Sequence, residues 1–153
     1  MLRFMMTAVF VMMVSVFSHS TQAGEALVVK QSTHNATVTM DRLQAIVEKK
    51  GLKVFARINH AGGAKMVGQN LAPTEVLIFG SPKLGTPLIQ NVRTFGLDLP
   101  LKVLVWEEPD GKAHLGYVAP VDLATRHGAT GVDKIIATMT TALDAMTSAA
   151  AQP

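Results

Sequence analysis

The amino-acid sequence predicts a single α+β domain, in which helices pack on one face of an antiparallel-rich sheet. The length of 153 residues fits one domain. With 48% hydrophobic and 16% charged residues, the composition is that of a folded rather than a disordered chain. Strand-like and helix-like segments follow one another in the order β-α-β-β-α-β-β-α-α, with neither an internal repeat nor a linker. This order favours an antiparallel sheet with its helices gathered on one side.

The N-terminal segment, residues 1–23, has the pattern of a secretory signal peptide. Arg3 is its only charge, and the apolar run of residues 4–17 is shorter than the roughly 20 residues that a membrane-spanning helix needs. Small residues at Thr21 and Ala23 then mark a cleavage site. We expect cleavage after Ala23 and an exported protein, periplasmic or secreted, with no membrane segment after cleavage. An uncleaved membrane anchor is the alternative.

The first strand and the first helix follow this segment. Residues 25–32 form a short apolar run with β-branched side chains, which predicts a strand. Thr37 or Thr39 is the expected N-cap of a helix whose apolar residues, three and four positions apart, form one buried face. Gly51 follows two lysines and ends this helix.

The middle of the chain predicts two more strands. Residues 52–60 alternate between two faces, which is typical of a strand with one side on the core. The residues predicted to face the core are Val54, Ala56, Ile58 and His60. Glycine-rich residues 61–71 predict a loop with a short helix. Residues 75–81 are apolar on both faces and predict a central strand.

The second half predicts a hairpin between short helices. Residues 85–95 form a short helix with a proline near its start. The strands of residues 101–107 and 113–119 are joined by an Asp-Gly turn. A further short helix begins at Pro120 and ends at Gly128.

The last helix closes the domain. Thr130 and Asp133 have the spacing of a capping box, and one apolar stripe follows along the helix. The alanine-rich end after Thr147 is expected to fray. Residues 24–130 therefore make up the body of the domain, and residues 131–153 add its C-terminal helix and tail.

The composition argues against several classes of function. The chain has no cysteine, which excludes disulfides, thiolate zinc sites and cysteine nucleophiles. No metal site or cofactor is predicted, because the histidines after the signal segment lack the i, i+4 spacing and the flanking carboxylates of ligands. Loss of Arg3 leaves 13 of the 14 basic residues against 11 acidic ones, too balanced for nucleic acid or an anionic membrane. Gly63 and Gly68 have phosphate-loop spacing, but the Lys and Ser/Thr of that motif are missing.

A few polar residues stand in unusual places. His60 ends a core-facing row, where it either opens a pocket or caps the edge of the core. Ser81, Lys83 and Thr86 lie near a helix start, where they either bind an anion or serve turn and capping chemistry. The candidate binding residues are His60, Glu75, Ser81, Lys83, Thr86 and Asp98.

Other polar and aromatic residues are given structural roles. Asp98 lies between leucines in a tight loop, and we expect it to cap that loop. His127 is interpreted as a cation at a helix C-terminus, and His114 as a solvated strand residue. Trp106, the single tryptophan, is expected to share a sheet face with Arg57 and to serve packing or an interface.

Three stretches of the chain resemble domain-of-unknown-function family 302. They are FARINHA at residues 55–61, LAPTEVLIFGSPKLGTPL at residues 71–88 and GLDLPLKVLVWE at residues 96–107, with a similar ending at residues 123–128. The resemblance implies a compact α+β domain, distantly like the TATA-binding-protein fold, that forms homodimers. It implies no established activity. Two departures are Ser81, where the family often has Asn, and residues 118–119, where it has Asn-Asp before the proline.

The sequence therefore favours an exported, non-enzymatic domain that binds a small ligand or a partner and forms a homodimer. One alternative is a small enzyme, with His60 as general acid/base, Glu75 or Asp98 to orient it, and Lys83 to hold an anionic group. This alternative requires the imidazole and a carboxylate within roughly 3 Å of each other or joined by a water. A structural or assembly module is the other alternative.

Overall fold

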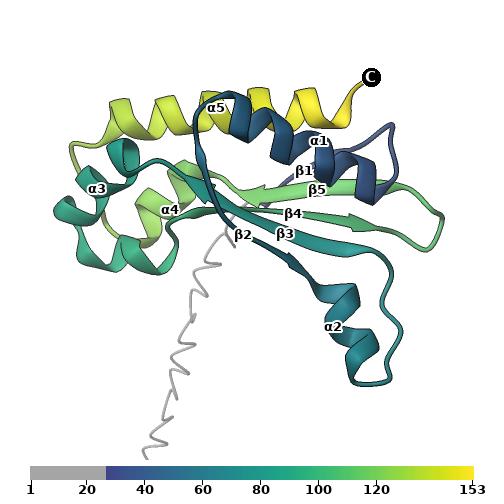
Figure 1. Cartoon of the computed structure of the whole chain (residues 1–153). Helices are drawn as coiled ribbons and strands as arrows, with labels where there is room; N and C mark the ends of the chain where they lie inside the picture. The colour runs from purple at the N-terminus through teal and green to yellow at the C-terminus, as the bar shows by residue number, and fades with distance from the viewer. Residues whose placement is uncertain (1–26) are drawn as a thin grey trace, which may run out of the picture.

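The computed structural model describes residues 27–153, so the expected signal peptide lies outside the described part (Figure 1). Its strands form one five-stranded antiparallel sheet in the order β1-β5-β4-β3-β2. The strands are β1 (Leu27–Gln31), β2 (Lys53–Asn59), β3 (Thr74–Gly80), β4 (Leu101–Glu107) and β5 (Ala113–Val118). Within the described residues β3 is an interior strand, paired on both sides, as its apolar sequence predicts.

The two longest helices lie side by side on one face of this sheet (Figure 1). These are α1 (Ala36–Lys49) and α5 (Asp133–Ala151). Four shorter helical segments surround the ends of the sheet: α2 (His60–Met66), α3 (Pro82–Asn91), the 3-10 turn η1 (Arg93–Leu97) and α4 (Pro120–Arg126). The predicted α+β class and the one-sided arrangement of the main helices are confirmed. No helix within residues 27–153 has the length and apolarity needed to cross a bilayer.

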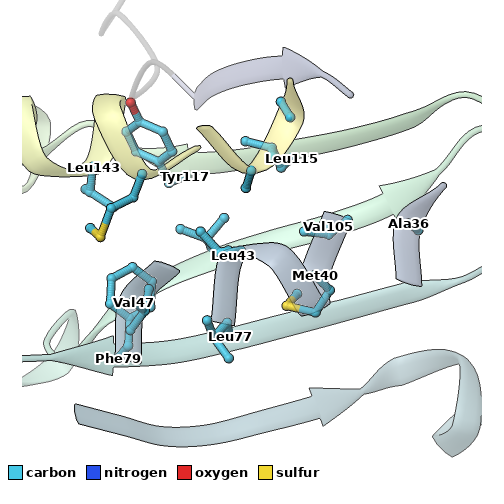
Figure 2. Close-up of a cluster of buried hydrophobic side chains, with 14 of the residues drawn as sticks. Ala36, Met40, Leu43, Val47, Leu77, Phe79, Val105, Leu115, Tyr117 and Leu143 are labelled. Atoms are coloured by element: carbon cyan, nitrogen blue, oxygen red, sulfur yellow. The ribbon is translucent and has the colours of Figure 1, made fainter. Parts of the chain in front are cut away.

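The main core lies between the sheet and the two long helices. Met40, Leu43 and Val47 are fully buried on one face of α1 and point to the sheet (Figure 2). Alternate residues of the strands, among them Leu77 and Phe79, meet them from the other side. The helical period of α1 and the two-residue period of the strands thus fix the same core.

A second hydrophobic cluster lies at one end of the sheet. Leu88 of α3, Phe95 of η1 and Leu123 of α4 pack there against Ile136 and Met139 in the N-terminal half of α5. Helix α5 therefore belongs to both clusters, because its C-terminal half packs in the main core.

The predicted core-facing row of β2 is wrong beyond Val54. A β-bulge between Val54 and Ala56 inserts Phe55 as an extra residue. Because one extra residue exchanges the two faces, Arg57 stands opposite Leu77 on the helix side, and Ile58 stands opposite Val76 on the other. His60 starts α2 and is exposed, so it does not close a core-facing row.

The expected fraying of the C-terminus is also wrong. Helix α5 continues to Ala151, and both Ala150 and Ala151 are buried. The side chain of Arg42 donates hydrogen bonds to the carbonyl oxygens of residues 149, 150 and 152, and the backbone N–H of Thr33 donates to that of Ala151. Tertiary partners thus satisfy the carbonyls that a free helix end leaves to water.

Three helix starts differ from the predictions. Asn35 is the N-cap of α1 and accepts from the N–H of Val38, whereas Thr39 is buried inside the helix. Helix α3 begins at Pro82, earlier than predicted. The N-cap of α5 is Val132, which makes no side-chain capping hydrogen bond, so the predicted capping box does not form.

Candidate functional site

The six candidate residues are divided between two ends of the sheet. Glu75 lies near the start of β3 and Ser81 just beyond its end, which separates them by roughly 20 Å at about 3.3 Å per residue. His60 lies at the same end of the sheet as Glu75, since the preceding residue, Asn59, pairs with Glu75. Asp98 lies at the other end, three residues before the start of β4, where Leu101 pairs with Phe79. The six residues therefore do not converge on one site.

Glu75 belongs to an ion-pair cluster on the helix side of the sheet. Arg57 Nε lies 2.5 Å from Glu75 Oε2, and Arg57 Nη1 lies 2.6 Å from Asp41 Oδ1 on α1. The hydrogen bond with Glu75 raises the pKa of Arg57, against the opposing effect of partial burial. This cluster holds the first half of α1 to β2 and β3, and it occupies the Glu75 carboxylate.

In the part of the chain that the structure describes, His60 has no hydrogen-bonded carboxylate of the kind that general acid/base chemistry requires. Its side chain is exposed, and among residues 27–153 no hydrogen bond or ion pair connects it to Glu75 or Asp98. Asp98 lies at the opposite end of the sheet, and Arg57 already holds Glu75. The described geometry does not assemble the pair on which the enzyme alternative depends.

The residues around Ser81 serve the start of α3. Ser81 is the N-cap, and its hydroxyl accepts the N–H of Lys83 at 3.3 Å. Lys83 and Thr86 are exposed in the first turns of this helix. Ser81 and Thr86 also lie at the wall of an apolar cavity beneath α3.

Asp98 joins η1 to α4 instead of capping its own loop. Both of its carboxylate oxygens lie 2.7 Å from Arg126 Nη1, and Oδ2 also lies 2.7 Å from His127 Nε2. A carboxylate only accepts, so Nε2 carries the proton, and in the neutral ring Nδ1 accepts from the Thr94 hydroxyl at 2.9 Å. The His127 side chain is 5% exposed and packs on the Phe95 ring.

His127 therefore has a role beyond the predicted cation at a helix end. It does stand at the C-cap of α4, as expected, but its ring is buried in this cluster. The pairing joins residues 28 and 29 positions apart, so no local pattern could have shown it.

The sheet face opposite α1 and α5 carries a continuous set of apolar side chains, here called the open face. In Figure 1 neither long helix lies on that side. Its residues, identified by the strand register, are Leu27, Val29, Ile58, Val76, Ile78, Leu104 and Trp106. Leu27, Val29 and Ile58 are 56%, 46% and 43% exposed, and the others are half-buried. Such contiguous exposed apolar surface is typical of an interaction site.

Trp106 lies at one end of the open face. A Cβ at Gly116 would come within 3.1 Å of its ring, so the absence of a side chain there lets the indole lie close against β5. The indole stacks on His114, with 5.6 Å between ring centroids, and donates a hydrogen bond to Glu108. Two predictions fail here. His114 is half-buried rather than solvated, and its Nδ1 has no hydrogen-bond partner among residues 27–153. Trp106 is on the sheet face opposite Arg57.

The fold and its sequence define a family of uncharacterised domains. The chain belongs to the family described as domain of unknown function DUF302, which it matches over residues 28–146. A crystal structure of an uncharacterised conserved DUF302 protein from Bacillus stearothermophilus has the same fold. Its TM-score is 0.73 at 18% sequence identity, with 81% of this chain and 97% of that one covered.

Two curated relatives are similar in sequence over part of their length. The fluoride-specific ion channel FluC 1 of Brucella suis is 46% identical over 101 residues, which are 66% of this chain and 40% of that protein. FluC 2 of Brucella melitensis is also 46% identical over 101 residues, 37% of its length. The chain thus spans about two fifths of the length of these relatives.

Proposed function

We propose that this protein is an exported, non-enzymatic binding domain that forms a homodimer through the open face. The observation that carries the proposal is the apolar surface on one side of the sheet, with Trp106 at its edge. Export is supported by the signal-peptide pattern of residues 1–23. Within residues 27–153, neither Glu75 nor Asp98 forms an ion pair with His60, which supports a binding role over catalysis.

The chemistry of the open face suits a second copy of the same chain. Its centre consists of aliphatic side chains, and the charge of Lys102 is held at one end by the carbonyl oxygens of Asp98 and Pro100. An apolar centre with polar groups at the rim is typical of homodimer interfaces. A two-fold axis that lies in the interface plane, perpendicular to the strands, would place the two apolar centres against each other and the two Lys102 side chains at opposite ends.

The size of the open face sets the expected strength of the dimer. Five strands about 4.8 Å apart and about 20 Å long give a face of roughly 480 Å2, or about 1,000 Å2 for two copies. That is the lower limit for a specific interface. Met66, Val67 and Leu71, in and after α2, are further exposed apolar side chains beyond the end of β2. We therefore expect a dimer of moderate affinity that dissociates on dilution.

The relatives favour a second candidate, a membrane channel as the partner. In the Brucella proteins the matching segment is part of a longer chain that is named a fluoride-specific ion channel. A domain that is joined to a channel in one protein can bind a separate channel in another. The same open face would then be covered by a different class of protein.

The test is the oligomeric state of the protein purified from the periplasm, where its first residue should be Gly24. Sedimentation at micromolar concentrations should show a dimer in equilibrium with monomer. Ile58→Asp should shift it to monomer, because the substitution places a charge in the apolar interface. Val121→Asp is the matched control, since Val121 is an exposed apolar residue on α4, outside the open face.

Three outcomes separate the candidates. A dimer that Ile58→Asp dissociates and Val121→Asp leaves intact supports self-association. A monomer that binds a purified FluC-type channel in detergent, and loses binding with Ile58→Asp, supports the channel. A protein that binds neither refutes the proposed role of the open face.

A further inference from the structure

We propose that the cavity between α3, α5 and the adjoining ends of β3 and β4 binds a small neutral molecule of about the size of a two-ring aromatic. The cavity has a volume of about 260 Å3. An apolar cavity of about 150 Å3 is known to hold benzene, so this one has room for a ligand roughly 1.7 times as large. It lies on the helix side of the sheet and is therefore separate from the open face.

The walls of the cavity determine the class of ligand. Met139, Leu143 and Met146 of α5 form one wall, and Phe79 and Leu99 contribute to the others. Methionine side chains are polarisable and adapt to aromatic rings. Among the described residues that line the cavity none is charged, so an ionised ligand would lose its hydration without gaining a counter-charge.

The polar groups at the wall limit the ligand to few hydrogen bonds. Ser81 and Thr86 carry the polar side chains of the lining, and the Ser81 hydroxyl already accepts the N–H of Lys83. Thr86 is exposed in α3, where its hydroxyl can pair with one hydroxyl or carbonyl group of a ligand. A mostly apolar site with one orienting polar group is typical of small-molecule pockets.

The cavity exists because two hydrophobic clusters meet without closing on each other. Leu143 and Met146 belong to the main core, whereas Met139, one turn earlier on the same helix, belongs to the second cluster. Leu101 packs against both clusters. Helix α5 contributes residues to both clusters, and the space between them is bounded by α5, α3 and the ends of β3 and β4. A preformed site spends little binding energy on ordering its walls.

The test uses 1-naphthol as probe, with naphthalene-1-sulfonate as its charged counterpart, measured by calorimetry on the protein of residues 24–153. Ala142→Leu fills the cavity, because Ala142 lines it from α5. Ala145→Leu is the matched control, since Ala145 is exposed on the same helix. Gly85→Ala is a milder variant: its new Cβ would lie 3.7 Å from Leu99 Cδ1, an ordinary contact, so the fold is kept.

We expect 1-naphthol to bind, Ala142→Leu to weaken it about tenfold or more, and Ala145→Leu to leave it unchanged. Gly85→Ala should weaken binding by about threefold, and the sulfonate should bind at least about tenfold more weakly than the naphthol. No binding of 1-naphthol, binding that survives both cavity variants, or equal affinity for the sulfonate would overturn the proposal. Quenching of Trp106, the single tryptophan, would place the probe on the open face and would equally overturn it.

Discussion

Replacement of Asp98 by alanine tests how the second hydrophobic cluster is held together. The substitution removes the carboxylate that accepts from Arg126 and His127 and so joins η1 to α4. The imidazole of His127 is 5% exposed, so its Nε2 proton would lose its partner where water has little access. Asp98 also precedes Leu99, which packs in that cluster, so the loss acts on the core directly.

The expected destabilisation is about 3 kcal/mol. A buried donor left without a partner costs roughly 1–3 kcal/mol, a range that already includes its lost hydrogen bond, and we take about 2 kcal/mol. The pair with Arg126 adds about 1 kcal/mol or less, because the arginine side chain is 39% exposed. With an unfolding entropy of about 2.1 cal/mol/K per residue over residues 27–153, the melting temperature should fall by roughly 11 °C.

Thermal unfolding followed by circular dichroism measures this shift. His60→Ala and Lys83→Ala are the controls, because both residues are exposed and neither belongs to the Asp98 cluster, so their melting temperatures should stay close to that of the wild type. A fall of less than about 3 °C for Asp98→Ala would refute the structural role assigned to this carboxylate. A fall of several degrees for both controls would show that they serve the fold and remove them from the candidate residues.

Two further variants test the C-terminal end of α5 and the core. Arg42→Ala should speed amide hydrogen exchange in residues 148–152 and lower stability by about 1 kcal/mol, because Arg42 satisfies carbonyls at the end of α5; unchanged exchange there would contradict this capping. Burial raises the pKa of Tyr117, so its neutral form contributes stability that is complete below pH about 10 and is lost as pH rises further. Denaturant titrations should therefore show a steeper alkaline loss in the wild type than in Tyr117→Phe, and identical pH profiles would exclude this cause.

The periodicity of the sequence predicted the order of the five strands and of the two long helices, and much of the core, whereas α2 and η1 are absent from the predicted order. The apolar stripe of α1, the two-faced apolar run of β3 and the hairpin of β4 and β5 depend on local spacing, and they appear in the structure as predicted. Family membership also follows from the sequence, since the motifs around residues 55–107 are present in the matched segment.

The candidate site was less predictable, because its residues are joined by contacts between distant segments. The bulge at Phe55 exchanged the faces of β2, so Arg57 turned to the helix side and His60 left the core-facing row. A bulge of one residue leaves no mark on composition or spacing. The pairing of Asp98 with His127 was also unpredictable from local sequence. Each residue alone looks like an ordinary loop or helix-end group, and only the fold brings the two together.

The sequence by itself determined the strands, the two long helices and the absence of cysteine chemistry, because these properties depend on neighbouring residues and on composition, and it predicts export. Only the tertiary structure decided which face of the sheet α1 and α5 cover, which ion pairs form, and that a cavity lies between the two hydrophobic clusters. The physical reason is that burial and pairing are properties of surfaces brought together by the whole fold. Strand register and helix position set those surfaces, and neither can be read from a local pattern.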